Sequence, residues 1–337
     1  MSGEATVSAP GKTILFGEHA AVYGHAALVT ALDHRMTVTA TSSAELPPGA
    51  LRLEIPALGI LRTIPTMNGA MAVKEPGDLA ILAVTIAAAG TEPRAAGLHV
   101  RIESAIPSGS GFGSSAALAV TVVAACRRAC GDDLGRDEIA RLASSIERHQ
   151  HERASGVDVL AVLRGGLLLC RRPAGGELVC EELPGTDTRL HGFRLFHSGT
   201  PNETTGEMVA AVRRLLDREP ARVRDAFATS ESATEDGRKA LLSGNVDALV
   251  PIVRRAEAAL EAIGVVPETV RDAIRKIEAA GGAAKISGAG GSTGPGGGLV
   301  LVVHPDPSWH ARFVPAPGWA AHRVRLGAPG LRSEEAA

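Results

Sequence analysis

Residues 107–115 are the part of this sequence that could most directly do chemistry. Glycines alternate there with other residues, and two serines close the segment just before residues 116–130, which are rich in Ala, Val and Leu. Residues 98–104 alternate apolar and polar side chains, as a strand does. The order is thus a strand, a glycine loop and the start of a helix. A helix start presents unpaired backbone N–H groups and the positive end of the helix dipole. The pattern favours a phosphate site, with a ligand-free tight turn as the alternative.

Neither common nucleotide-binding signature fits this chain. The Walker A pattern needs Gly-x4-Gly-Lys-Ser/Thr, and Gly11-Lys12-Thr13 has Thr6 where the first glycine is required. The dinucleotide fingerprint, Gly-x-Gly-x-x-Gly, has two residues before its third glycine, whereas here a single residue separates Gly111 from Gly113. The sequence therefore excludes a P-loop and disfavours hydride transfer.

Three motifs resemble those of the GHMP small-molecule kinases. Residues 107–117 are similar to the central Pro-x-Gly-x-Gly-Leu-Gly-Ser-Ser-Ala motif, with Phe112 in place of Leu. Residues 9–24 are similar to the N-terminal motif, and residues 285–291 resemble the C-terminal Lys-x-Thr-Gly-Ala-Gly-Gly motif. The three motifs occur in the family's order and at its spacing, which makes the resemblance specific.

Further stretches resemble the mevalonate kinase branch of that family. Glu147 lies eleven residues before the Asp of Ser155-Gly156-Val157-Asp158, as in that branch. The first motif reads Gly-Glu-His, with His19 where phosphomevalonate kinases have Tyr. Residues 198–209 are similar to a stretch with a threonine near the substrate, for which Thr205 and Thr204 compete.

The resemblance implies a two-domain α+β fold with the ATP site at the cleft. It implies an N-terminal domain of sheet and helices over residues 1–180 and a C-terminal α/β domain over residues 181–327. Residues 328–337 are expected to form a frayed tail. Strand patterns at 6–9, 13–16, 36–40 and 51–55, and helical patterns at 206–218, 220–243, 245–262 and 267–280, agree with this order.

The resemblance also implies the roles of the site residues. Asp158 would accept the proton of the substrate hydroxyl, and Lys12 would pair with Asp158 and with the developing charge. Ser115 and Glu147 would bind Mg²⁺. The ATP phosphates would lie on Pro107, Ser108, Gly109, Ser110, Gly111, Phe112, Gly113, Ser114 and Ser115. The substrate contacts would be Lys12, Glu18, His19, Ser155, Asp158, Thr205, Gly288 and Ala289.

Each single residue also has a structural interpretation. Asp158 could cap a helix, and Lys12 and Glu147 could be solvated side chains. His19 could be a hydrogen-bonded interior histidine, an interpretation as good as a substrate contact. The chain departs from the family at 292–298, where the glycine loop is longer, and at 55–59, where an asparagine near the adenine is missing.

The composition sets limits on function. The 337 residues are 45% hydrophobic, which excludes disorder, and 35 Lys and Arg against 37 Asp and Glu give no electrostatic reason to expect nucleic acid or a membrane as partner. The four cysteines lack metal-type spacing, so we expect small core or surface residues in a reducing cell interior, and neither a structural zinc site nor a disulfide scaffold. No targeting segment is seen, which predicts a cytoplasmic protein and leaves a homodimer open.

The functional prediction is the ATP-dependent phosphorylation of mevalonate to 5-phosphomevalonate. A related kinase that acts on phosphomevalonate or homoserine is the enzymatic alternative. A non-catalytic nucleotide-binding regulator is the alternative from another class, and the presence of Lys12, Glu147 and Asp158 together argues against it.

Overall fold

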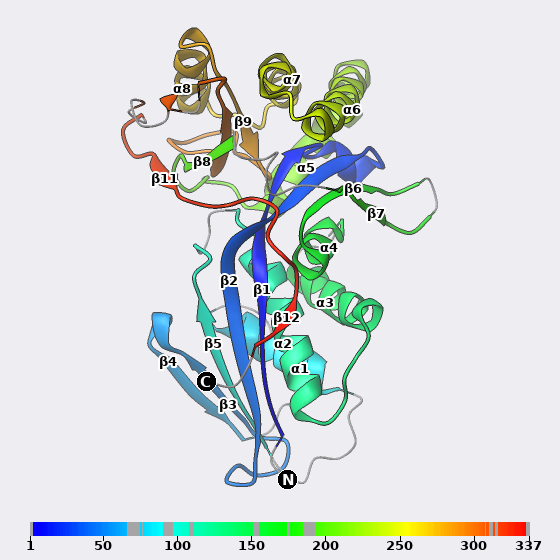
Figure 1. Ribbon diagram of the computed structural model, residues 1–337, viewed down its shortest axis with the longest axis vertical. Helices are drawn as coiled ribbons and strands as arrows, with labels where there is room; N and C mark the ends of the chain where they lie inside the picture. The colour runs from blue at the N-terminus through cyan, green and yellow to red at the C-terminus, as the bar shows by residue number, and fades with distance from the viewer. Residues whose placement is uncertain are drawn as a thin grey trace.

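The computed structural model consists of two β-sheets and the helices packed on them (Figure 1). It describes residues 3–65, 75, 77–89, 97–107, 111–150, 155–173, 176–184, 193–306, 308–309, 313 and 316–334. Strands β1 and β2 run along the molecule from the first sheet towards the helices of the C-terminal half. No helix in these ranges is long and apolar enough to cross a bilayer.

The first sheet has the strand order β12-β1-β2-β5-β3-β4, with β6 paired to β2 and β7 paired to β6. All neighbours are antiparallel except β3 and β5. Leu98, Val100 and Ile102 of β5 point inward and the polar residues between them point outward, so one face of this sheet can be buried. The strands are β1 (Glu4–Phe16), β2 (Ala27–Ser43), β3 (Leu51–Ile55), β4 (Ile60–Ile64), β5 (Gly97–Ser104), β6 (Leu167–Arg171), β7 (Val179–Glu182) and β12 (Arg332–Ser333).

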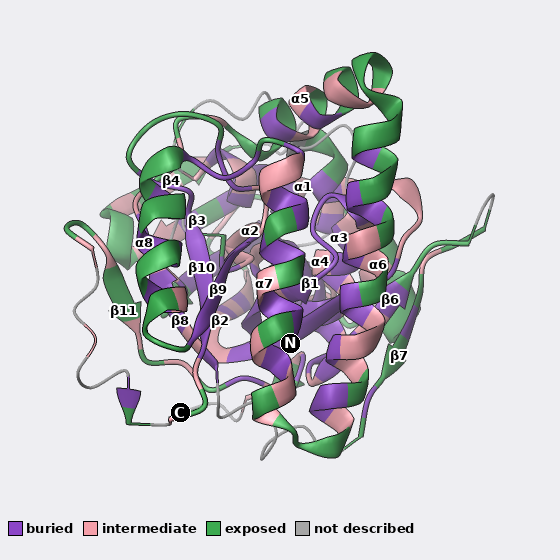
Figure 2. Cartoon of the chain, turned by 90° about the horizontal axis from the view of Figure 1, so that it is seen from above, coloured by how far each residue is buried: buried purple, intermediate pink, exposed green. Residues whose placement is uncertain are grey.

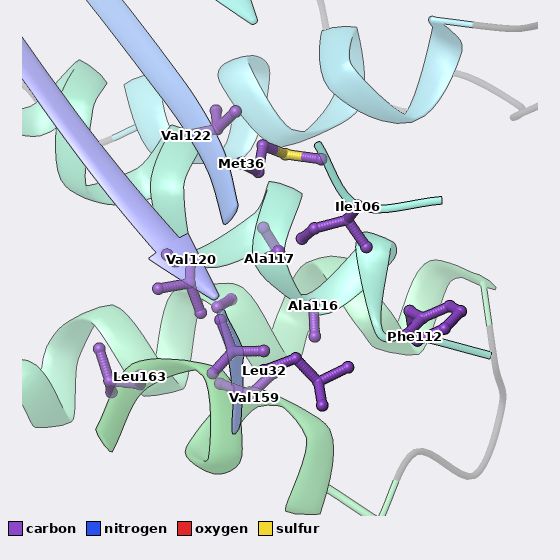
Figure 3. Close-up of a cluster of buried hydrophobic side chains, with 14 of the residues drawn as sticks. Leu32, Met36, Ile106, Phe112, Ala116, Ala117, Val120, Val122, Val159 and Leu163 are labelled. Atoms are coloured by element: carbon purple, nitrogen blue, oxygen red, sulfur yellow. The ribbon is translucent and has the colours of Figure 1, made fainter. Parts of the chain in front are cut away.

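Helices cover the apolar face of the first sheet. They are α1 (Asp78–Ala88), α2 (Ser114–Ala129), α3 (Arg136–Gln150) and α4 (Val157–Arg164), with short 3-10 turns η1 (Ala20–Tyr23) and η2 (Pro56–Leu58) between strands. The apolar helix α2 lies at the centre, where Ala116 and Val120 pack near Leu32 of β2 and Val159 of α4 (Figure 3). This core holds the start of α2 and the start of α4 in fixed positions.

The second sheet has the order β11-β8-β10-β9 and belongs to the C-terminal half. Every residue of β10 is buried, as expected for a strand covered on both faces. Figure 2 shows the helices of this half lying over the buried strands. The elements are β8 (Phe193–His197), β9 (Ala283–Ser287), β10 (Leu299–Val303), β11 (Ala320–His322), α5 (Thr205–Arg218), α6 (Pro220–Ser243), α7 (Val246–Ala262) and α8 (Glu268–Ala279).

The prediction of a frayed tail is wrong for residues 328–334, the part of that segment that the structure describes. The segment returns to the first sheet, where β12 pairs with β1 and Pro329 bridges to Gly165. The Arg35 guanidinium donates to the carbonyls of Pro329 and Gly330 at 2.7 and 2.8 Å. A side chain at Gly330 would collide with the carbonyl of Leu163, which explains a glycine there.

The expectation that the cysteines are core or surface residues in a reducing interior is wrong for two of the four. Cys170 and Cys180 form a disulfide across the antiparallel pair of β6 and β7, where they stand opposite each other. The sequence did not show that Cys180 lies in a strand, because β7 is short and lacks a pattern of alternating apolar residues. Its pairing with β6 could therefore not be predicted. Val157 of α4 packs in the same small cluster as the two cysteines.

Candidate active site

Lys12 and Asp158 form an ion pair between two distant parts of the chain. The Lys12 Nζ lies 2.9 Å from Asp158 Oδ1, and the Lys12 side chain is only 6% exposed against 35% for Asp158. Lys12 follows a register irregularity in β1, and its backbone N–H donates to the carbonyl of Phe112 at 2.8 Å. Asp158 lies in the first turn of α4, after Gly156 at φ 80°. The two charges predicted to act together are therefore adjacent.

The glycine loop ends at this ion pair. Gly113, at φ 77°, precedes the first residue of α2, and a Cβ on it would lie 2.7 Å from Cγ of Lys12. The Lys12 stem thus crosses the helix start at a place that only glycine leaves open. Ser114 and Ser115 form the first turn of α2, Gly111 has φ 80°, and Phe112 is buried. The predicted phosphate residues Ser108, Gly109 and Ser110 lie outside the described residues, while Pro107 is described just before them.

Glu147 of α3 shares the electrostatic environment of this pair. Burial and the negative charge of Asp158 raise the pKa of Glu147 to about 8, while Lys12 opposes the shift. Two neighbouring carboxylates repel each other, so both can be ionised more easily when a cation binds between them. The raised pKa of Glu147 therefore suits a cation site. In the described part of the chain no cluster of three His, Cys, Asp or Glu forms a metal cage. Glu147 and a serine hydroxyl fit Mg²⁺, because this ion takes few protein ligands and uses phosphate oxygens as well.

The first motif is joined to the third motif by hydrogen bonds. Thr13 and Ser287 hydroxyls lie 2.8 Å apart, and Ser287 Oγ also donates to the carbonyl of Ile14 at 2.8 Å. His19 Nε2 lies 2.9 Å from the carbonyl oxygen of Ala289, and burial lowers the pKa of His19. His19 has φ 57°, which is uncommon for a residue with a side chain. Of the two interpretations of His19, the structure shows the interior hydrogen bond.

Glu18 is buried and forms an ion pair with Lys285 of β9. Its carboxylate is therefore engaged inside the protein, which differs from the predicted contact with substrate. Gly288 and Ala289 follow β9, with Gly288 at φ 106°. The longer glycine loop after them is tied down by Glu203, which accepts hydrogen bonds from Ser292 and Thr293.

The remaining two predicted substrate residues lie at helix starts. The backbone N–H of Val157 donates to Ser155 Oγ at 3.3 Å, so Ser155 supports the turn before Asp158. Thr205 is the exposed first residue of α5, and Thr204 is its N-cap in a capping box with Glu207. The capping role accounts for Thr204 without a substrate, so Thr205 stays the candidate for the substrate contact.

Three residues near the site were not predicted. Lys285 and Ser287 join the third motif to the first, and Arg172 donates to the carbonyl of Ser155 at 2.8 Å. Lys285 was visible as a motif residue and as one of few lysines, since 30 of the 35 basic residues are Arg. Its partner Glu18 stands far away in the sequence, so the pairing itself left no signal.

The sequence and the site define a class of protein. Residues 78–166 match the family model of the GHMP kinases N terminal domain. This segment contains Gly113, Glu147 and Asp158, and thus most of the site described above. The site and the match are those of a GHMP kinase.

Relatives define the family more narrowly. The mevalonate kinase of Methanothermobacter thermautotrophicus is 30% identical over 97% of this chain and 99% of its own length. That of Archaeoglobus fulgidus is 32% identical over 84% of this chain and 88% of its own. The crystal structure of the Methanococcus jannaschii mevalonate kinase is similar with a TM-score of 0.76 and 20% identity, covering 95% of this chain and 98% of that one. The chain belongs to the mevalonate kinase family and is a kinase, and the predicted α+β fold of the GHMP kinases is confirmed.

Proposed function

We propose that this kinase transfers the γ-phosphoryl group of ATP to the C5 hydroxyl of mevalonate. The observation that carries the proposal is the Lys12–Asp158 pair at the glycine-lined start of α2. The relatives that cover almost the whole chain bear the name mevalonate kinase. ATP and its acceptor are small cytoplasmic solutes, so the proposal includes a cytoplasmic location.

In the proposed reaction the C5 oxygen attacks the γ-phosphorus and the bond from that phosphorus to the bridging oxygen of ADP breaks. The hydroxyl proton passes to Asp158, which is exposed enough to meet a substrate. An alcohol is a weak acid, so an ammonium beside both oxygens favours the charge that develops on the attacking oxygen. Lys12 supplies that ammonium, and its buried stem keeps the charge in place.

Phosphoryl transfer also requires that the charge on the triphosphate is neutralised. The backbone N–H groups at residues 111–115 and the dipole of α2 favour phosphate there. Ser115 and Glu147 would hold Mg²⁺, which neutralises phosphate charge when bound. Burial and the charge of Asp158 raise the pKa of Glu147, so a cation beside it would favour its ionised form.

The acceptor would lie between the first and third motifs. His19 meets Ala289 there through the hydrogen bond from the histidine ring to the Ala289 carbonyl, and Gly288 directly precedes Ala289. Ser155 and Thr205 are proposed to border the acceptor at the starts of α4 and α5. Glu18 would not contact the acceptor directly, because it is buried in the ion pair with Lys285.

An assay of ADP release over a panel of acceptors tests the proposal. Mevalonate, phosphomevalonate, homoserine and galactose are offered with ATP and Mg²⁺, and kcat/KM is compared. We expect mevalonate to be preferred by at least one order of magnitude. Preference for another acceptor would assign the related kinase activity, and ATP binding without turnover of any acceptor would favour the regulator.

A further inference from the structure

Three ionisable side chains meet inside the protein where the end of β1 approaches β9. Lys285 of β9 and Glu257 of α7 have no exposed surface, and Glu18, between β1 and η1, is 3% exposed. Lys and Glu are almost never buried to this extent unless they are paired. The reaction proposed above does not use Glu257, so its burial needs a separate explanation.

Glu257 and Lys285 together hold the backbone of Ile286. The Ile286 N–H donates to Glu257 Oε2 at 3.0 Å, and the Lys285 ammonium donates to the Ile286 carbonyl at 2.7 Å. These backbone groups need such partners, because among the described strands β9 is the last of its sheet and pairs with β10 on one side. The Lys285 ammonium also donates to Glu18 Oε1. The other oxygen of Glu257, Oε1, is buried with no hydrogen-bond partner among the described residues.

The cluster contains two carboxyl groups and one ammonium group. Burial raises the pKa of Glu257 to about 8, against the opposing effects of the Ile286 N–H and Lys285. Glu261 of the same helix and Glu18 of the first loop raise it further by their charge. Burial also raises the pKa of Glu18, but Glu18 has the direct hydrogen bond from Lys285. The ion pair is therefore Glu18 with Lys285, and Glu257 is neutral at pH 7.

The position of the first loop depends on this cluster. His19 follows Glu18 directly and is held at Ala289, three residues beyond Ile286. We propose that Glu257 is a further positioning residue: its carboxyl group fixes β9 at Ile286 and so directs the Lys285 ammonium to Glu18, which holds the His19 loop at the acceptor site. A residue of α7 thereby sets the geometry of the proposed acceptor site. This inference rests on the proposed acceptor site.

Three variants of Glu257 test the inference by steady-state kinetics with each substrate varied in turn. Glu257→Leu leaves the Ile286 N–H without an acceptor, and we expect KM for mevalonate to rise about tenfold while KM for ATP changes by less than about twofold. Glu257→Gln keeps an acceptor oxygen and the neutral state, so both KM values should stay near those of the parent. Glu257→Asp withdraws the carboxyl group by one methylene and should raise KM for mevalonate to a smaller extent.

The control is Glu261→Leu, on the same helix, where the lost partner is Arg275 at the surface. It should leave both KM values unchanged. The inference is overturned if folded Glu257→Leu, or Glu257→Asp should the former not fold, keeps the parental KM for mevalonate. It is also overturned if Glu257→Gln raises KM for mevalonate as much as Glu257→Leu does. A third contrary result is a Glu257→Leu variant in which the fraction of active protein falls while KM for mevalonate stays at the parental value. Failure of the parent to phosphorylate mevalonate would instead refute the proposed function.

Discussion

Replacing Lys12 by Met removes the ammonium from the site and keeps most of the buried stem. The Nζ lies 2.9 Å from Asp158 Oδ1, where two unit charges attract by about 6 kcal/mol at an effective dielectric constant of about 20. Desolvation of the lysine and screening at the partly exposed aspartate offset much of this in the resting protein. What turnover loses is the stabilisation of the charge that develops on the acceptor oxygen. One preorganised electrostatic partner contributes about 2.7–4 kcal/mol, which is a fall in kcat of about 10²–10³.

The assay is steady-state ADP release at saturating ATP and mevalonate, with the folded fraction checked by thermal unfolding. Lys276→Met, at an exposed position of α8, is the matched control and should retain parental kcat. ATP affinity should change much less than kcat, because the α2 start and Ser115 remain. A Lys12→Met variant with kcat within tenfold of the parent would refute the assignment of the ammonium to the reacting oxygen.

Three further predictions concern the surroundings of the site. Gly113→Ala adds a Cβ 2.7 Å from Cγ of Lys12 and should therefore lower kcat. Gly131 also has a positive φ but has open space around it, so Gly131→Ala should leave kcat unchanged. Each variant should lose about 1–2 kcal/mol of stability because of its positive φ, and equal kcat in the two variants would contradict the prediction. Reduction of the disulfide between β6 and β7, with a sequence separation of 10, should lower the free energy of unfolding by about 2–3 kcal/mol; an unchanged thermal midpoint in dithiothreitol would be the contrary result. The folded-state pKa of Glu257 is raised to about 8, so the folded protein retains a proton that the unfolded chain releases above about pH 4.5. Stability from this group therefore falls as pH rises from about 4.5 to 8, and urea unfolding should show a smaller loss over that range for Glu257→Gln than for the parent.

Much of the fold could be predicted from local patterns. The helices of the C-terminal half follow their apolar periodicity, so the predicted 220–243 coincides with α6 and 267–280 differs from α8 by one residue at each end. The alternation at 98–104 gives β5 to within one residue. These elements were visible because each buries one face of a regular repeat.

Long-range pairings could not be predicted in the same way. The segments 6–9 and 13–16 were expected as separate strand patterns, yet they form one strand, β1, because β2 pairs along its whole length. The short β7 and β12 exist only through the strands that they join. Arg35, which holds the C-terminal segment, looks like any surface arginine in the sequence.

The candidate site shows the same division. The motifs indicated Lys12, Glu147 and Asp158, and the structure brings all three together. The buried pairing of Glu18 with Lys285 was not predicted, because it depends on how β9 meets the end of β1. Local motifs thus indicate the candidate reacting groups, and the tertiary structure shows the residues that hold them.

The most direct test of the central claim is single-turnover phosphoryl transfer by Asp158→Asn. The asparagine has nearly the same shape and cannot accept the hydroxyl proton, so turnover should be abolished while ATP, measured by equilibrium binding, still binds with near-parental affinity. Phosphoryl transfer by this variant at close to the parental rate would contradict the assignment of Asp158 as the base.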